Sequence, residues 1–136
     1  MKIAVMGAGA VGCYYGAMFA LAGHAVTMIG RPAHVEAMQA DGIVLLKAGT
    51  RHRAPVRATT EPSGVAGAEL VLISVKSDDT VAAATAIAPH LADNARILSL
   101  QNGVDNAERL EAVFGRAVIP AAVYVAVETL AAGQVR

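Results

Sequence analysis

Residues 7–12 have the sequence Gly7-Ala8-Gly9-Ala10-Val11-Gly12 and join two predicted elements of secondary structure. The apolar run at residues 3–6 predicts a buried strand, and residues 13–22 predict a helix. A glycine turn between a strand and a helix leaves several backbone N–H groups free and places them at the positive end of the helix dipole. We therefore expect these six residues to bind an anion of the kind found in a pyrophosphate.

The three glycines of this motif have separate predicted roles. Gly7 permits the tight turn, Gly9 lets the backbone approach the pyrophosphate, and Gly12 lets the helix pack close to the strand. Gly16 and Ala20 continue the same small-residue face of the helix. Because the motif directly follows a strand at the start of a strand–helix–strand pattern, we interpret it as a dinucleotide-binding turn and not as a merely structural one.

The rest of the chain alternates predicted strands and helices. The first strand, the first helix and the second strand form a βαβ unit of about thirty residues, the length that a dinucleotide-binding fold requires. We therefore expect an α/β fold of the Rossmann type, a doubly wound and mostly parallel sheet with helices on both faces. Strands are expected at residues 24–29, 70–75, 96–100 and 117–127, helices at residues 33–40, 79–88 and 107–114, and a hairpin at residues 43–47 and 51–58.

The length of 136 residues fits one domain, a dinucleotide-binding domain that covers residues 1–136. Hydrophobic residues make up 55% of the chain, mostly Ala and Val, and this composition is typical of a sheet covered by helices. The last residues, Gly133-Gln134-Val135-Arg136, carry no stop signal. We expect the pattern to continue beyond them, so that this chain is part of a two-domain protein.

The charge and the apolar runs argue against several classes of protein. The formal net charge is zero, which does not favour binding to nucleic acid or to an anionic membrane. The longest apolar run, residues 117–127, contains Pro120 and is shorter than the ~20 residues that span a bilayer. The first predicted strand begins at Lys2, without room for a signal peptide, and the single Cys13 cannot form an internal disulfide. We therefore expect a cytoplasmic protein.

Arg31 lies where NAD-type sites of this fold carry an acidic residue. In those sites the acidic residue follows the second strand, about twenty positions after the glycine turn, and binds the ribose 2′-hydroxyl. Here that place has the sequence Met28-Ile29-Gly30-Arg31, with a guanidinium and no carboxylate. Because a guanidinium presents a fixed fork of donors that suits a phosphate, we interpret Arg31 as a ligand of the 2′-phosphate of NADP. The alternative is a surface arginine without such a role.

Two further polar residues directly follow predicted strands. Open α/β sheets bind ligands beyond the carboxyl ends of their strands, so both residues are candidates for the site. Lys76 would place an ammonium group near the nicotinamide ribose or a substrate anion, although it also fits a solvated strand end. Asn102 would donate a hydrogen bond to a carbonyl group or to the ribose, although an Asn-Gly pair also fits a simple turn.

The remaining polar and reactive residues have structural interpretations. Cys13 has no cationic neighbour that would activate its thiol, and we expect it in the core. Asp78 and Asp79 are expected to begin a helix, where the dipole favours carboxylates. The histidines lack the spacing of metal ligands, so no metal site is predicted. They are His24, His34, His52 and His90.

Several stretches of the sequence together resemble the ketopantoate reductase (2-dehydropantoate 2-reductase) family. The glycine motif is shared with many dehydrogenases, whereas its combination with Arg31, a lysine at a strand end and Gln-Asn-Gly-Val is much more specific. The resemblance covers nearly the whole chain. The matching stretches are residues 7–12, Tyr15-Gly16, Ala22-Gly23-His24 to Arg31, Ser74-Val75-Lys76-Ser77 and Leu100-Gln101-Asn102-Gly103-Val104.

The resemblance implies NADPH-dependent reduction of the ketone of 2-dehydropantoate to pantoate, a step toward pantothenate and coenzyme A. It implies that Arg31, Lys76 and Asn102 contact the cofactor, that Asn102 also lies near the substrate, and that Ala126 is a further cofactor contact. In the family, the catalytic lysine and a substrate-binding glutamate come from a second, helical domain. No catalytic residue is therefore expected within this chain.

Three functions remain open at this point. The first is the cofactor domain of an NADPH-dependent reductase of a small 2-oxo acid. The second is a related dehydrogenase, of the opine type or acting on an amino-acid-derived or phosphorylated substrate, and the third is a non-enzymatic NADP(H)-binding or sensing module. For the first function we expect a chain that binds NADPH without turning over substrate by itself. We also expect an apolar surface near residues 117–127, covered by a second copy in a homodimer or by another partner.

Overall fold

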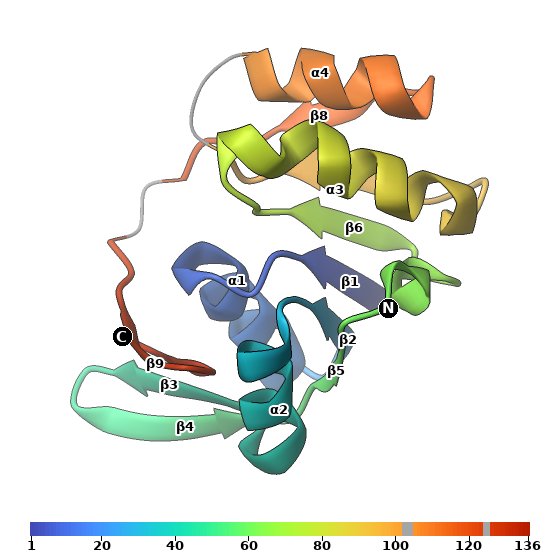
Figure 1. The fold of residues 1–136 in the computed structure, drawn as a ribbon. Helices are drawn as coiled ribbons and strands as arrows, with labels where there is room; N and C mark the ends of the chain where they lie inside the picture. The colour runs from blue at the N-terminus through green and yellow to red at the C-terminus, as the bar shows by residue number, and fades with distance from the viewer. Residues whose placement is uncertain (102–104, 124–125) are drawn as a thin grey trace.

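The structure is a computed structural model that describes residues 1–101, 105–123 and 126–136. Its centre is the strand β1 (Lys2–Met6), in which Ile3, Ala4 and Val5 are buried. β1 belongs to a six-stranded parallel sheet with the order β5-β2-β1-β6-β7-β8 (Figure 1). The other strands of this sheet are β2 (Ala25–Ile29), β5 (Arg57–Thr59), β6 (Leu70–Ile73), β7 (Arg96–Ser99) and β8 (Val118–Pro120).

The order of the strands reverses between β1 and β6. From β1 the chain moves outward through β2 to β5 and then returns to place β6 on the other side of β1. Such a reversal is a topological switch point, where open α/β sheets bind ligands beyond the carboxyl ends of the strands. The predicted Rossmann-type fold is therefore confirmed, and the glycine motif that follows β1 lies at the switch point.

Helices cover both faces of the parallel sheet, as predicted. On one face, Cys13 of α1 and Met38 of α2 pack into the core that contains Val5. On the other face, Ile87 packs, together with residues of α4, into the core that contains Ala4. Because side chains alternate along a strand, neighbouring residues of β1 serve the two cores. The helices are α1 (Ala10–Leu21), α2 (Pro32–Asp41), α3 (Thr80–Ile87) and α4 (Asp105–Phe114), with single turns η1 (Pro62–Val65), η2 (Ser77–Asp79) and η3 (Ala88–His90).

Among the helices of the described ranges, none has both the length and the apolar character that crossing a membrane requires. α1, for example, has 12 residues, about 18 Å at 1.5 Å per residue, against a hydrocarbon core of about 30 Å. The helices instead contribute small apolar residues to the packing against the sheet. Gly16 of α1 is an example, because a Cβ atom there would lie 2.6 Å from the sulfur of Met28 in β2.

A smaller sheet with the order β4-β3-β10-β9 lies at the opposite side of the molecule from α4 (Figure 1). The predicted hairpin forms half of it, and Ala48 and Gly49 at the hairpin turn have positive φ angles of 51° and 77°. The other half comes from the last residues of the chain, where Val135 is buried in the same core as α1. Its strands are β3 (Ile43–Lys47), β4 (Thr50–Ala54), β9 (Thr129–Ala131) and β10 (Gln134–Val135).

The segment at residues 51–58 corrects the predicted hairpin. β4 ends at Ala54, and the chain then crosses to the large sheet, where β5 pairs in parallel with β2. Pro55 has no N–H group with which to continue the pairing to β3, which explains why the hairpin ends there. The second strand of the hairpin is therefore shorter than predicted, and residues 57–59 form an edge of the parallel sheet instead.

The predicted strand at residues 117–127 is wrong in its length. β8 covers only Val118–Pro120, at the other edge of the parallel sheet. A proline is tolerated at an edge, but it does not donate to a sheet ladder, and the strand ends there. The last bond to the sheet is donated by the N–H group of Ala121 to the carbonyl oxygen of Ser99, at 2.9 Å. Further along, the chain joins the smaller sheet through β9 and β10.

Candidate cofactor-binding site

Gly7 and Gly12 form a tight turn that has no room for side chains. Gly7 has a φ angle of 116°, and a Cβ atom there would lie 2.8 Å from Ser74 Oγ. A Cβ atom at Gly12 would overlap the carbonyl oxygen of Gly7, because α1 begins inside the motif, at Ala10, and not at residue 13 as predicted. The structure therefore accounts for the predicted turn and packing roles of these two glycines.

Gly9 faces open space instead. A Cβ atom there would meet no other atom within 4 Å. Gly9 is the N-cap of α1, and within the described residues no side chain caps this helix and no acidic residue occupies its first turn. The N–H end of a helix of 12 residues is thus open toward a negatively charged ligand.

A cavity of about 530 Å³ lies beside this turn. It is lined by residues of the glycine motif, by Arg31 after β2 and by Lys76 after β6. Another cavity, of about 470 Å³, lies at the opposite edge of the sheet, where Lys2 and Ala25 begin β1 and β2. Because this class of fold binds ligands at the carboxyl ends of its strands, we take the cavity beside the glycine turn as the candidate site.

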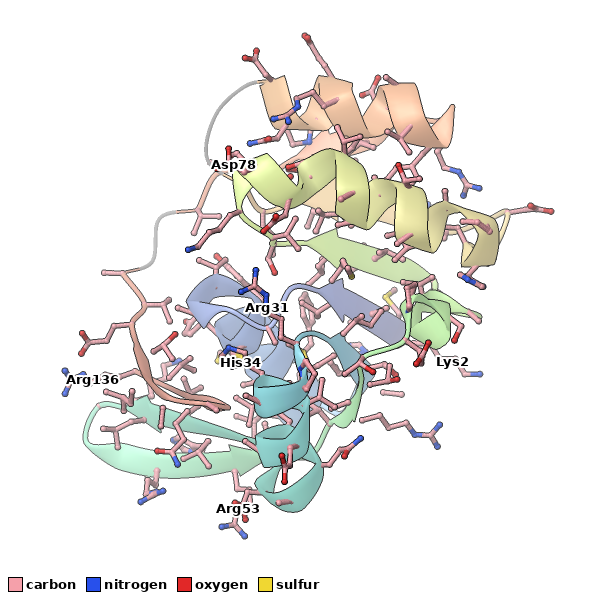
Figure 2. All side chains as sticks on the ribbon, in the orientation of Figure 1. Lys2, Arg31, His34, Arg53, Asp78 and Arg136 are labelled. Carbon is pink, nitrogen blue, oxygen red and sulfur yellow. The ribbon has the colours of Figure 1, made fainter. Side chains whose placement is uncertain are left out.

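Arg31 is held beside the glycine turn by the packing of its neighbour Gly30. A Cβ atom at Gly30 would lie 2.6 Å from the Cβ atom of Ala8, so only glycine allows the end of β2 to approach the motif this closely. Arg31 itself is the N-cap of α2, directly before Pro32. Its side chain is 83% exposed and points from the start of α2 toward α3 (Figure 2). There its Nη2 atom lies 3.9 Å from Oδ2 of Asp79.

A buried hydrogen-bond network holds the turn that carries Lys76. Gln101 Nε2 donates to the carbonyl oxygen of Val75 at 2.9 Å and to Thr80 Oγ1 at 2.7 Å. Gln101 follows β7, so these bonds join the carboxyl ends of β6 and β7. Lys76, between Val75 and η2, is exposed and lines the cavity. Lys76 therefore lies at the carboxyl ends of the strands, on the same side as the glycine motif, and its contact with a cofactor stays a prediction.

Asn102 lies outside the described residues, so its predicted contact with the cofactor stays a prediction. Its described neighbours on both sides contact the segment around Lys76, since Gln101 bonds to Val75 and Asn106 Nδ2 donates to Ser77 Oγ at 3.1 Å. Ala126, the least specific of the predicted contacts, is exposed and is absent from the described residues that line the cavity. The structure thus brings together the glycine motif, Arg31 and Lys76 around one cavity, and a contact of Ala126 with the cofactor stays a prediction.

The cavity also contains two residues that the sequence does not single out as ligands. His34 lies three residues after Arg31 in the first turn of α2, and its Nδ1 atom is buried without a hydrogen-bond partner among the described residues. Asp79 is the N-cap of α3, as expected of a residue that begins a helix, but its side chain makes no capping bond within the described part of the chain. The spacing of Arg31 and His34 could have indicated that His34 lies at the same site as Arg31, because residues three apart share a side of a helix. No local feature of the sequence indicates that Asp79 lies near Arg31.

Cys13 and the histidines do not form a reactive or metal-binding centre in the described ranges. Cys13 is buried, as predicted, and its Sγ donates to the carbonyl oxygen of Ala8 at 3.3 Å. Burial raises the pKa of this thiol to about 11, so it stays protonated at neutral pH and is a poor nucleophile. No group of three or more His, Cys, Asp or Glu side chains among the described residues is arranged to hold a metal ion.

A parallel sheet with this strand order, a glycine turn at its switch point and basic side chains after the adjacent strands defines the class of dinucleotide-binding α/β domains. Within that class, the family model described as "Ketopantoate reductase PanE/ApbA" matches residues 3–136. The chain belongs to the ketopantoate reductase family. The predicted resemblance is therefore confirmed.

Individual relatives agree with this assignment. The chain is 38% identical over 105 residues to a 2-dehydropantoate 2-reductase of Mesorhizobium japonicum, with 76% of this chain and 32% of the relative covered. It is 36% identical over 118 residues to the enzyme of that name from Pyrococcus horikoshii, with 87% and 38% covered. Residues 1–136 thus span between about a third and two fifths of these curated relatives.

Solved structures give the same picture. A PanE/ApbA family ketopantoate reductase from Ralstonia eutropha is 52% identical to this chain with a TM-score of 0.96, and the alignment covers 100% of this chain and 46% of that one. The 2-dehydropantoate 2-reductase of Porphyromonas gingivalis is 33% identical with a TM-score of 0.88, and 99% and 50% are covered. The chain therefore corresponds to about half of each of these proteins.

Proposed function

We propose that residues 1–136 form the NADP(H)-binding domain of an enzyme that reduces 2-dehydropantoate to pantoate. The observation that carries this proposal is the meeting of the glycine motif, Arg31 and Lys76 on one cavity at the switch point of the sheet. The substrate is inferred from the family, since the curated relatives carry the name 2-dehydropantoate 2-reductase. We further propose Asn102 and Ala126 as contacts of the bound cofactor or substrate.

The chemistry of the cavity fits a dinucleotide. The open N–H end of α1 and the free space at Gly9 suit a pyrophosphate, which needs donors and a close approach to the backbone. Arg31 offers a fork of donors that matches a 2′-phosphate, and Lys76 offers a compact positive charge. The end of β2 carries Arg31 and no carboxylate, so we propose that NADPH is preferred over NADH.

In this mechanism the residues of the chain bind the cofactor and orient it toward the substrate. When bound, the nicotinamide cofactor supplies the hydride that reduces a ketone. The glycine motif fixes the pyrophosphate, Arg31 fixes the adenosine end, and Lys76 attracts either the ribose hydroxyls or the carboxylate of a 2-oxo acid. The network around Gln101 keeps the turn of Lys76 in place while this happens. We propose that the proton for the developing alkoxide comes from a second, helical domain outside residues 1–136.

Calorimetric titration of NADPH and NADH into the wild type and Arg31→Ala tests this proposal. Loss of a charge-assisted hydrogen bond, roughly 1.5–3 kcal/mol, predicts a ten- to hundredfold weaker binding of NADPH and little change for NADH. Arg53→Ala is a matched control, because Arg53 is also exposed and paired with a carboxylate, Asp41, but lies away from the cavity (Figure 2). Binding of neither cofactor, or an equal loss in both arginine variants, contradicts the proposal.

A further inference from the structure

We propose that Asp79 is a specificity-determining residue of the cofactor cavity. In this proposal its carboxylate opposes a 2′-phosphate bound at Arg31 and accepts a hydrogen bond from a ribose hydroxyl. The site then prefers NADPH over NADH less strongly than a site with Arg31 and without Asp79 would. This inference rests on the proposed function and concerns the cofactor selectivity of the same site.

The first observation is the position of the carboxylate. Oδ2 of Asp79 lies 3.9 Å from Nη2 of Arg31, and both residues line the cavity of about 530 Å³. The two side chains come from opposite sides of the switch point, since Arg31 follows β2 and Asp79 precedes α3. An anion bound by Arg31 therefore comes close to the carboxylate of Asp79. This carboxylate comes from the segment before α3 and not from the end of β2.

The second observation is that the carboxylate of Asp79 is not used by its own helix. Aspartate is a favoured N-cap residue because its side chain normally accepts a bond from the first N–H groups of the helix. Asp79 ends η2 directly before α3 with helical backbone angles (φ −96°, ψ 0°), so its side chain is not placed to cap α3, and it makes no capping bond within the described part of the chain. Its backbone N–H group donates to the carbonyl oxygen of Lys76, at 2.9 Å, which fixes the backbone beside the cavity.

The electrostatic consequence differs between the two cofactors. With NADPH, the phosphate must share Arg31 with a carboxylate about 4 Å away. Two like charges 4 Å apart in water change a Kd by about fivefold, and this sets the order of magnitude of the penalty if the phosphate approaches Asp79 as closely as Arg31 does. With NADH, the ribose 2′-hydroxyl donates a hydrogen bond, and Asp79 can accept it as the acidic residue of NAD-type sites does. The acidic residue missing from the end of β2 is thus supplied from across the cavity.

The other charged groups nearby do not duplicate this effect. Lys76 lines the cavity and is positive, and His34 offers a nitrogen next to Arg31. Asp78 is the neighbouring carboxylate, but it is exposed and absent from the described residues that line the cavity. In Figure 2, Asp78 lies in the turn η2 just before α3, whereas Arg31 and His34 lie at the start of α2. Asp78 therefore offers a control with the same charge one residue away.

The experiment measures the Kd of NADPH and of NADH for the wild type, Asp79→Asn and Asp78→Asn. Because the Asp79 side chain makes no capping bond to α3 within the described residues, replacing it with asparagine of the same shape removes the charge and keeps the fold of α3. For Asp79→Asn we expect NADPH to bind about five- to tenfold more tightly and NADH to bind several-fold more weakly at low salt. At about 1 M salt, where the Debye length is about 3 Å, the gain for NADPH shrinks. Asp78→Asn leaves the ratio of the two constants unchanged.

The outcomes separate this inference from the function on which it rests. If the wild type binds NADPH but Asp79→Asn changes the ratio of the two constants by less than about twofold, this inference is overturned and the proposed function stands. This inference is also overturned if Asp78→Asn shifts the ratio of the two constants as much as Asp79→Asn does. The shift would then come from the overall charge of this region and not from the position of Asp79. If the wild type binds neither cofactor, the proposed function fails and this inference fails with it.

Discussion

Gly9 differs from the other glycines of its motif in what surrounds it. Side chains at Gly7 and Gly12 are excluded by the protein itself, through Ser74 Oγ and the carbonyl oxygen of Gly7. A side chain at Gly9 meets nothing within 4 Å, so the protein alone gives no reason for glycine there. A ligand whose phosphates approach the backbone gives that reason.

We therefore expect Gly9→Val to abolish NADPH binding while the protein remains folded. The φ angle of −76° at Gly9 is one that any residue adopts, so valine adds no backbone strain. The melting temperature should stay within a few degrees of the wild type, whereas calorimetry should detect no binding of NADPH. Gly7→Ala is the contrasting variant, because the φ angle of 116° and the contact with Ser74 should lower the free energy of unfolding by about 1–3 kcal/mol. NADPH binding by Gly9→Val at the wild-type affinity means that the pyrophosphate lies elsewhere.

At this scale the sequence predicts residues that carry a local signal and misses those that do not. The roles of Gly7 and Gly12, the burial of Cys13 and the position of Lys76 follow from neighbours within a few residues in the chain. The approach of Asp79 to Arg31 joins residues that are far apart in sequence, and it depends on how α3 packs beside the end of β2. Such a pair is visible only in the folded chain.

At the scale of elements, the turn between β6 and α3 depends on a residue of the next strand. Gln101, after β7, supplies two of the bonds that hold this turn, one to the backbone of Val75 and one to the side chain of Thr80. The side chains of the network are buried at Gln101, Thr80 and Ser99, whose hydroxyl contacts Gln101 Oε1 at 3.2 Å, and Val75 is partly buried. Buried polar groups that lose their partners cost more than the same groups in water.

We expect Gln101→Ala to lower the free energy of unfolding by about 1–3 kcal/mol, because it leaves buried acceptors without a donor. NADPH binding should weaken as well, since the turn of Lys76 loses its tie to β7. Urea unfolding measures the first effect and calorimetry the second. Thr85→Ala removes an exposed bond to the carbonyl oxygen of Val81 and should change stability by about 0.5 kcal/mol or less. A Gln101→Ala protein as stable as Thr85→Ala would show that the network contributes little.

The four inner strands of the parallel sheet were predictable because their signals are local, whereas its two edge strands and the smaller sheet were predicted only in part. Apolar runs and glycine or proline stops mark β1, β2, β6 and β7. The pairing of β10 with β3 joins Gln134 to Val44, and nothing near either residue encodes it. For the same reason the crossing of residues 57–59 to β2 was missed, although Pro55 marks the place where the hairpin ends.

At the scale of the whole molecule, the chain corresponds to about half of the solved relatives. Part of its surface is apolar, since Ile119 of β8 is 51% exposed and Leu130 of β9 is 45% exposed. Ile119 lies in the segment 117–127, near which the sequence predicts a covered surface, and Leu130 follows three residues after it. We propose that a second domain or a second copy of the chain covers them.

We expect residues 1–136 to bind NADPH but not to reduce 2-dehydropantoate, because the acid that protonates the alkoxide is proposed to lie outside them. An assay of NADPH oxidation with 2-dehydropantoate should give only the background rate. Sedimentation in the same buffer reports whether the apolar surface joins two copies. A turnover number near the ~10 s⁻¹ that is typical of enzymes would overturn the expectation and place the catalytic acid within this chain.

The location of the cofactor is the central claim, and an NMR titration of NADPH into the ¹⁵N-labelled chain tests it most directly. The two cavities lie at opposite edges of the sheet, so the amides that shift show which cavity binds the cofactor. We expect saturable shifts at the amides of Gly7, Gly9, Arg31 and Lys76, and none at Lys2 or the other residues around the cavity at the amino ends of the strands. Shifts confined to that opposite cavity, or no shifts at a saturating concentration of NADPH, would contradict the account.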